Sequence, residues 1–258
     1  MKSKKFSIVV LGLCVVLAMP LMGCGDDDNG NGGATFKATV KDRMSRTPLG
    51  GKTCRAVAND TGDPIAGFVA TSEANGSISF KDLPGTEVGF KCDGVTGEHV
   101  DTYQFNISTT AQDEELWLVD LGTYQMAPAL AGVTLDTTKG LVAGSVYWEN
   151  ANDEEEPVGC GQVTSNMGGE IRYFGENELP VKTVAEDPVN GRDGTHPNNG
   201  LFLVCNMDPG AATLGLEIDG QAKGSVNVVT FGAENTVLIS NIYADETLTA
   251  NPTPAGCE

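Results

Sequence analysis

The chain has 258 residues, of which 35 are Asp or Glu and 16 are Lys or Arg, giving a formal net charge of −19 at pH 7. This charge repels phosphate backbones and argues against a nucleic-acid partner. Apolar residues make up 40% of the chain, enough for one large core or two small ones, and 33 Gly with 12 Pro indicate many turns.

Residues 1–23 have the organisation of a secretory signal peptide. Lysines at the start precede an apolar run over 6–17, which is shorter than the about 20 residues that a membrane-spanning helix needs. The next four residues, 21–24, read Leu-Met-Gly-Cys and resemble the lipobox of bacterial lipoproteins. The resemblance implies cleavage before Cys24 and attachment of acyl chains such as palmitate to it. The alternative is an ordinary signal peptide in which Cys24 is incidental.

Residues 24–34 are predicted to form a flexible tether. They are rich in Gly, Asp and Asn, with no large apolar side chain to pack. Three aspartates at 26–28 fit repulsion and solvation better than a calcium site, because no structured loop pre-organises them. The lipoprotein resemblance implies a body anchored by lipid in the bacterial cell envelope. We expect the outer rather than the inner membrane, with the body facing the periplasm or the cell surface.

The residues from 35 to 126 have the pattern of β-strands. Apolar residues alternate with polar ones around Phe36, Ile78 and Leu116, between clusters of Gly, Pro, Asn and Asp. Such short period-two runs describe an all-β sandwich. No window shows a sustained 3.6-residue apolar period with caps, so helices are predicted to be minor.

The same order of turn signals returns in the second half of the chain. Pro-Leu-Gly-Gly at 48–51 corresponds to Pro-Val-Gly at 157–159, and Asn-Gly at 75–76 corresponds to Asn-Gly at 199–200. A Pro-Gly turn follows each Asn-Gly pair. Asn-Gly suits a two-residue hairpin with positive φ at both turn positions. Shared signals in one order indicate a structural repeat.

These signals resemble carboxypeptidase regulatory-like domains, which are prealbumin-like seven-stranded β-sandwiches related to the Cna-B repeats of surface proteins. The resemblance implies two tandem sandwiches, one over 35–126 and a longer one over 127–247, followed by a tail at 248–258. Its motifs are structural and carry no catalytic residue. Some Cna-B repeats cross-link a lysine to an asparagine, but Lys37 and Lys41 are out of step with that pattern, so no isopeptide bond is predicted.

Export would place the cysteines in an oxidising compartment, where disulfides persist. Each half holds two cysteines, and we predict the pairs Cys54–Cys92 and Cys160–Cys205. Each bridge would contribute about 4 kcal/mol in the chain-entropy account. The paired positions are not equivalent in the repeat, so either each half acquired its bridge separately or the second pair is wrong. The odd Cys257 is free, pairs between chains, or replaces a partner in the second half.

Little in the sequence suggests catalysis. The two histidines, His99 and His196, lie beside turn residues, and no serine-hydrolase elbow, His-Glu-x-x-His pair, P-loop or dinucleotide-binding glycine pattern occurs. The cysteines lack zinc-site spacing. We therefore expect a protein without enzymatic activity and without a cofactor. A pocket bringing His196 near an Asp or Glu would revive a catalytic function.

Two acidic loops are candidates for a calcium site. One contains Asp60 and Asp63, and the other contains Asp153 and Glu154. Oxygen-rich loops at the end of a sandwich can hold Ca²⁺. Neither loop has the spacing of an EF-hand, and solvated turns explain both, so Ca²⁺ stays the alternative.

The second half contains a longer insertion. The segment between its Pro and Asn-Gly signals spans 42 positions against 27 in the first half, and the excess falls in 165–197. Inserted loops on a rigid sandwich commonly carry binding residues. Trp148, Tyr173, Phe174 and His196 are candidates for a surface that stacks on sugars or peptides. The alternative is that Tyr173 and Phe174 help form a hairpin packed on the sheet.

Together these features predict a non-catalytic, lipid-anchored envelope protein acting as a structural or binding module. Its partners would be the membrane, through the lipid, and a carbohydrate or an envelope protein. The alternative is an accessory subunit that docks on a secreted enzyme or an envelope transport complex.

Overall fold

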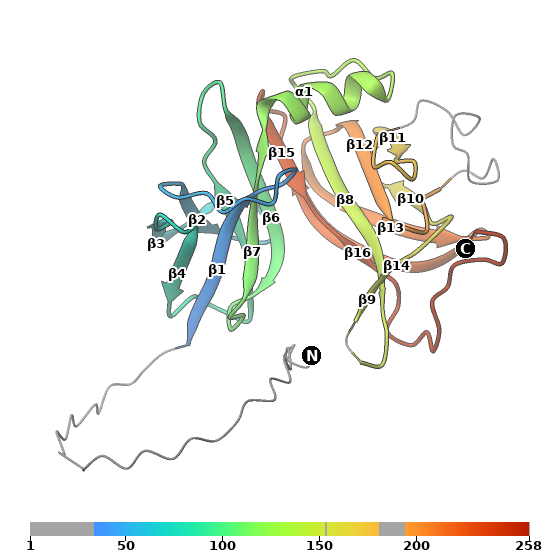
Figure 1. Ribbon diagram of the computed structural model, residues 1–258, viewed down its shortest axis with the longest axis horizontal. Coiled ribbons are helices and arrows are strands. Elements are labelled where there is room, and N and C mark those ends of the chain that lie inside the picture. Colours follow the sequence, from blue (N-terminus) through green and yellow to red (C-terminus); the bar gives the residue numbers. More distant parts are fainter. Residues whose placement is uncertain (1–33, 153, 181–193, 258) are drawn as a thin grey trace, which may run out of the picture.

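The computed structural model describes residues 34–152, 154–180 and 194–257 (Figure 1). The predicted signal peptide, Cys24 and all but the last residue of the tether lie outside the described residues, as do Asp153 and part of the long insertion, 181–193. Within the described residues, no helix is both long enough and apolar enough to cross a membrane.

The described chain is built almost wholly of strands, as the sequence predicts. The first half contains β1 (Thr35–Asp42), β2 (Thr53–Val57), β3 (Pro64–Thr71), β4 (Ser77–Lys81), β5 (Glu87–Cys92), β6 (His99–Ser108), β7 (Glu114–Asp120) and the helix α1 (Leu121–Leu130). The second half contains β8 (Gly140–Glu149), β9 (Glu155–Pro157), β10 (Gln162–Ser165), β11 (Glu170–Tyr173), β12 (Leu201–Met207), β13 (Gly210–Ile218), β14 (Gln221–Thr230), β15 (Thr236–Ile239) and β16 (Ile242–Tyr243).

The first half is a seven-stranded sandwich. One sheet has β1 between β4 and β7, and the other runs in the order β6, β5, β2 and β3. Alternate residues of β1 are buried, as expected for strands with one face on a core. The rings of Phe36 and Phe90 stack across the two sheets with centroids 4.7 Å apart, and Phe80 packs beside them. These residues fill the first core.

The second half repeats this topology. β8 pairs with β12, β15 and β16 as β1 pairs with β4 and β7, and β10, β13 and β14 correspond to β2, β5 and β6. Equivalent hydrogen bonds occur: Val40 N donates to Gly76 O (2.8 Å), and Val146 N donates to Gly200 O (2.9 Å). The second sandwich is not seven-stranded, however, since its described residues form nine strands.

The Asn-Gly turns differ from the expected two-residue hairpins. Only the glycines have positive φ, 82° at Gly76 and 63° at Gly200. Gly76 N donates to Glu73 O (2.8 Å), which closes a four-residue turn. In each half the asparagine side chain accepts a hydrogen bond from the amide two residues later, at 3.0 Å. The signal marks a turn correctly, but a longer one.

Strand β15 joins the two halves into one sheet. It runs parallel to β6, from Thr236 opposite Asp101 to Ile239 opposite Gln104, and it also pairs in parallel with β8. The sheet therefore continues from β11 in the second half to β3 in the first (Figure 1). Parallel strands need no turn between them, so no turn signal in the sequence announces this pairing.

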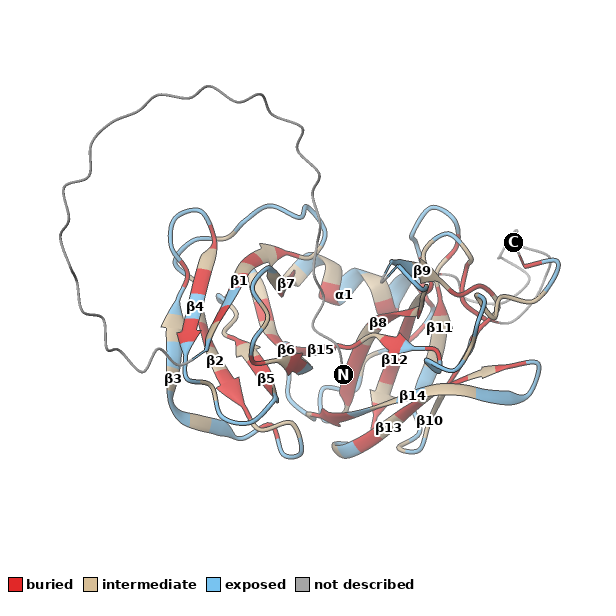
Figure 2. Ribbon diagram, turned by 90° about the horizontal axis from the view of Figure 1, so that it is seen from below, coloured by how far each residue is buried: buried red, intermediate tan, exposed pale blue. Residues whose placement is uncertain are grey.

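Both faces of the shared sheet are covered where the halves meet. On one face, Phe231 of the second half stacks on Tyr103 of β6, with ring centroids 4.1 Å apart, beside Phe105. On the other face, α1 lies over a cluster contributed by both halves, here called the junction cluster. It consists of Val100, Val119, Tyr124, Ala131, Val133, Leu141, Leu203, Cys205, Val237 and Ile239. Buried residues thus continue through the junction (Figure 2).

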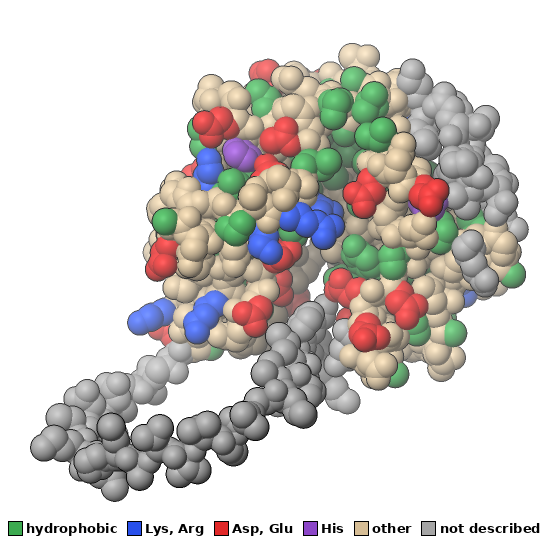
Figure 3. All heavy atoms as spheres, in the orientation of Figure 1, with side chains coloured by type: hydrophobic (Ala, Val, Ile, Leu, Met, Phe, Trp, Pro, Cys, Tyr) green, Lys and Arg blue, Asp and Glu red, His purple; other side chains and the backbone are tan. Residues whose placement is uncertain are grey.

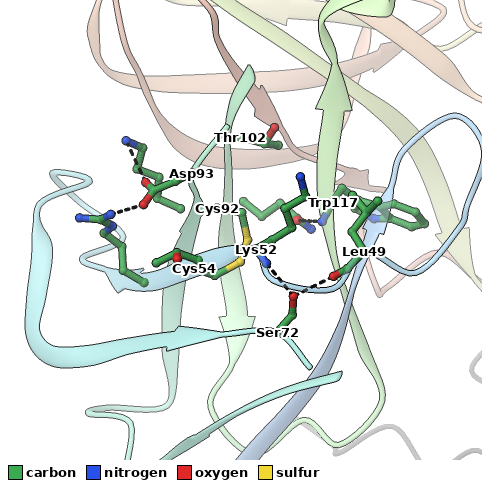
Figure 4. Close-up of a disulfide and its surroundings, with 12 residues drawn as sticks. Leu49, Lys52, Cys54, Ser72, Cys92, Asp93, Thr102 and Trp117 are labelled. Atoms are coloured by element: carbon green, nitrogen blue, oxygen red, sulfur yellow. Dashed lines mark hydrogen bonds and ion pairs between the residues drawn. A yellow bond between two sulfur atoms is a disulfide. The ribbon is translucent and has the colours of Figure 1, made fainter. Parts of the chain in front are cut away.

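Two disulfides close the described chain. Cys54 on β2 and Cys92 on β5 are bonded at directly paired positions, as predicted (Figure 4). The second predicted pair, Cys160–Cys205, is wrong: Cys160 bonds to Cys257, and Cys205 is a free thiol.

Strand direction explains the second pairing. Cys205 lies fully buried on β12 with its side chain in the junction cluster, and burial raises its pKa to about 12. Cys160 lies just before β10, in the opposite sheet. The C-terminal tail returns to this turn, where Gly159 N donates to Thr253 Oγ1 (2.9 Å). The tail therefore carries Cys257 to Cys160.

Candidate functional site

The structure does not form the predicted stacking surface. Trp148 and Tyr173 are each only 9% exposed and belong to the core of the second half. Trp148 Nε1 donates to Leu248 O (3.3 Å), and Tyr173 Oη accepts a hydrogen bond from Val163 N (2.9 Å). Tyr173 also stands opposite Phe202 in the β11–β12 pair. Tyr173 thus lies in a strand of the sheet itself rather than in a hairpin packed on it.

The other two residues of that predicted surface are also packed inward. Phe174 is half-buried against the junction cluster. His196 is 3% exposed, and its Nδ1 accepts a hydrogen bond from Asn198 N (3.1 Å). Its Nε2 has no hydrogen-bond partner among the described residues.

The acidic loops are separate exposed turns. Asp60 and Asp63 lie in the turn between β2 and β3, and Glu154 lies before β9, where its Oε2 accepts a hydrogen bond from Asn150 Nδ2 (3.0 Å). Among the described residues, no three His, Cys, Asp or Glu side chains gather as a metal-binding group. Calcium binding at these loops stays a prediction.

An open depression of about 450 Å³ lies where the β13–β14 turn meets the C-terminal tail. Its charged lining residues are Asp219 and Lys223, and Leu248 and Pro252 line the tail side. It contains no histidine or cysteine, and its surface is part turn and part tail. We assign no chemistry to it.

A more distinctive set of side chains meets where the two halves adjoin. The molecular surface is hollowed between the halves, with Lys and Arg side chains at the upper edge of the hollow and Asp and Glu side chains on both sides (Figure 3). We call this region the front groove and define it by Arg43, the Trp117 ring below its guanidinium, and Tyr147 and Glu178, which lie within electrostatic range of it.

The strands place these residues by alternation. Leu116 and Leu118 of β7 point into the first core, so Trp117 between them points out of it, and its ring extends away from the disulfide in Figure 4. On β8, Val146 and Trp148 point into the second core, so Tyr147 faces the opposite side. α1 lies over the upper part of this face (Figure 1).

Arg43 lies on the first-half side of the groove. Its backbone N donates to Leu118 O (2.8 Å), and its guanidinium stands over the Trp117 ring, 5.1 Å from the centroid. This distance suits a cation–π contact. Burial lowers the pKa of Arg43, while Tyr147 and Glu178 across the groove act in the opposite direction.

A buried carboxylate fixes the loop that carries Arg43. Asp42 Oδ1 accepts hydrogen bonds from Ser45 N (2.7 Å) and Met44 N (3.1 Å), and Oδ2 lies 3.3 Å from His99 Nε2. Burial alone would raise the pKa of Asp42, but these hydrogen bonds hold it below its usual value. The loop after β1 is therefore held in place from its first residue.

Sequence reasoning missed this groove. Its residues come from four separate segments, and only the fold brings them together. One local signal was available: Trp117 stands between two apolar residues in an alternating strand, at the position that points away from the core. A large aromatic side chain there indicates a contact or a binding surface.

No protein-family model and no curated protein matches the chain. Among solved structures, it is similar to the Bacillus anthracis TIE protein (TM-score 0.25, 11% identity, 83% of this chain and 34% of that chain). It is also similar to a streptococcal ancillary pilin (TM-score 0.24, 15% identity, 84% and 64%) and to GBS52, the minor pilin of Streptococcus agalactiae (TM-score 0.24, 13% identity, 83% and 98%). The chain thus spans about a third of the TIE protein chain. The pairing of the strands defines the β-sandwich fold.

Proposed function

We propose that the chain is a lipid-anchored, non-catalytic module of the bacterial cell envelope, which presents a binding surface on a rigid two-part body. Residues 21–24 supply the acylation signal, and the tether that follows separates the body from the membrane. With so strong a negative charge, the body is repelled by anionic lipid headgroups, so the acyl chains supply the attachment.

The observation that carries this proposal is the pairing of β15 with both β6 and β8. Tandem domains joined only by a linker move independently by default. Here the shared sheet and the packing on both of its faces hold the halves in one orientation. A fixed orientation is what a spacer or a platform requires.

Metabolic labelling tests the anchor. In a Gram-negative host given radioactive palmitate, the full chain should be labelled and found in the membrane fraction, and globomycin should block its processing. Cys24→Ala should abolish the label, whereas the matched variant Cys14→Ala, in the apolar run of the signal, should keep it. Labelling that survives Cys24→Ala would contradict the anchor.

Spin labels test the rigid body. Glu73→Cys and Gln221→Cys place labels on exposed positions of the two halves, while the thiol of Cys205 stays buried. We expect one narrow distance distribution by double electron–electron resonance. A broad distribution would show a hinge and would overturn the platform.

A further inference from the structure

We propose that the front groove binds a sugar that carries a single carboxylate group, and that Arg43 recognises this carboxylate. This site goes beyond the proposed envelope role, and neither depends on the other.

The first support is the state of the Arg43 guanidinium. The other half-buried Lys and Arg side chains in the described parts of the chain each bond a polar side chain, which is a carboxylate in every case except Lys223, bonded to Gln221. Arg43 is half-buried, and its guanidinium forms no hydrogen bond or ion pair with any described residue; its contact is the Trp117 ring. A guanidinium held in this way presents its planar fork of N–H donors to an incoming carboxylate.

The second support is the set of donors around it. The Trp117 indole N–H and the Tyr147 hydroxyl also lack a hydrogen-bond partner among the described residues. The Tyr147 ring lies beside that of Tyr243, tilted by 38° with ring centroids 6.2 Å apart. Half-buried donors and aromatic rings suit a ligand rich in acceptor oxygens with apolar C–H faces. A sugar ring has both.

The strand pairing argues against an extended peptide as the ligand. Peptides commonly bind sheets by adding a strand to a free edge. At the groove, β8 is paired with β12 on one side and with β15 and β16 on the other, and β15 is paired on both sides. The Gln104 side chain binds the backbone of the adjoining β7: its Nε2 donates to Glu115 O (3.1 Å), and its Oε1 accepts a hydrogen bond from Trp117 N (2.6 Å). Within the described ranges, β7, β8 and β15 therefore offer no free edge at the groove.

The surrounding charges limit the ligand to one carboxylate. Arg46, Glu178 and Glu115 lie within electrostatic range of the guanidinium; Arg46 is exposed to solvent, and Glu115 is already ion-paired with Lys41. The whole chain carries a net charge of −19. A second negative charge on the ligand would meet repulsion with no further unpaired, half-buried cation among the described residues to offset it.

Binding to small sugars tests the proposal. The full-length chain in mild detergent is titrated with methyl β-D-glucuronide, and saturation-transfer NMR and calorimetry detect the complex. We expect saturable, salt-sensitive binding of the glucuronide and none of methyl β-D-glucoside, which has a hydroxymethyl group in place of the carboxylate. Sodium acetate and an acidic tripeptide should bind far more weakly.

Variants locate the site. Arg43→Gln and Arg43→Lys should each weaken glucuronide binding by at least about tenfold, because neither offers the guanidinium fork. Trp117→Phe, which keeps a ring and removes the N–H, should weaken it by a smaller factor. The control Lys81→Gln, which removes an exposed cation at the end of β4, should change it by less than about twofold.

Several results would overturn the proposal. These are no glucuronide binding by the folded wild type, equal binding of the glucoside, equal binding of acetate or peptide, or unchanged binding by Arg43→Gln. Circular dichroism establishes that each variant is folded. Loss of glucuronide binding alone would leave the labelling and spin-label results of the envelope role unaffected, so the two proposals fail separately.

Discussion

Two glycines occupy equivalent turns in the two halves, and each is required by its surroundings. Gly76 and Gly200 both have positive φ, which L side chains rarely adopt. A Cβ at Gly76 would lie 2.8 Å from Val40 O, and one at Gly200 would overlap Val146 O. Val40 N donates to Gly76 O, and Val146 N donates to Gly200 O, so each glycine lies against the valine to which it is hydrogen-bonded. One residue type thus serves both the turn and the neighbouring strand.

Gly200→Ala should therefore destabilise the protein more than an ordinary glycine substitution. We expect a loss of about 3 kcal/mol, from left-handed backbone strain together with displacement of β8. The matched control is Gly97→Ala, since Gly97 has φ of 82° but open space around its Cβ position. That variant should lose about 1 kcal/mol. Urea unfolding measures both, and equal losses would contradict the role of the close approach.

Asp42 links the acid sensitivity of the protein to the loop beside the groove. Its pKa is lower in the folded state than in the unfolded chain, because Ser45, His99 and Met44 bond the carboxylate despite its burial. The stabilisation is therefore complete above the ordinary carboxylate pKa and is lost as the pH falls through the lower, folded value.

Asp42→Asn should accordingly cost stability at pH 6 and cost less as the pH falls below about 4. Urea midpoints at pH 6, 4 and 3 should show the gap between wild type and variant closing. Asp60→Asn, at an exposed turn position, serves as the control and should leave a small, constant difference. A gap for Asp42→Asn that stays constant with pH would contradict the lowered pKa.

Among the described elements, the short strand β15 joins the two halves of the molecule. Four residues connect two sheets through parallel pairs on both sides. All four are buried, with Leu238 in the core of the second half and Val237 and Ile239 in the junction cluster. The strand thus contributes backbone hydrogen bonds and packing at once.

Replacing Leu238 separates these contributions. Leu238→Ala removes packing alone and should cost about 2–5 kcal/mol. Leu238→Pro also removes an N–H from the middle of a sheet, so it should cost more. The amide of Leu238 faces β8, because Ser240 N bonds Ala143 O two residues later while Asn235 O bonds β6. Hydrogen exchange should therefore show loss of protection along Val142–Ala143 of β8 in the proline variant, while the β2–β5 ladder stays protected. Equal exchange in the two variants would show that β15 does not hold β8.

The sequence predicts the parts of this fold that depend on residues close together in the chain. Alternating apolar residues locate β1, β4 and β7, and the Asn-Gly and Pro-Gly turns reveal the repeat. The bond of Cys54 to Cys92 follows from two cysteines in one half. What is missed depends on distant contacts: β15 beside β6, Cys257 beside Cys160, and the groove around Arg43. Trp148 and Tyr173 were misjudged because an aromatic residue near a loop has the same local pattern whether packed or exposed.

At the scale of the whole molecule, two sandwiches with cores of their own behave as one body. The first core is formed by residues of β1 to β7, and the second draws on β8 to β16 with Val57 and Phe105 from the first half. The junction cluster joins them. Small domains that share a sheet and a core should unfold together.

The two tryptophans report on this coupling, because Trp117 lies in the first half and Trp148 in the second. In Trp148→Phe the fluorescence follows the first half, and in Trp117→Phe it follows the second. Within each variant, the urea midpoint by fluorescence should coincide with that by far-UV circular dichroism. Midpoints that separate within a variant would show halves that unfold independently.

The late position of β15 also bears on how the chain matures. A nascent chain emerges from its amino end, so β6 is synthesised long before Thr236. Until β15 is synthesised, the edge of β6 that pairs with it stays without a partner. An unpaired strand edge beside the aromatic residues Tyr103 and Phe105 can pair with strands of other chains and cause aggregation. Fragments that stop before β15 should therefore aggregate, and a holdase that shields β6 should be needed until synthesis is almost finished.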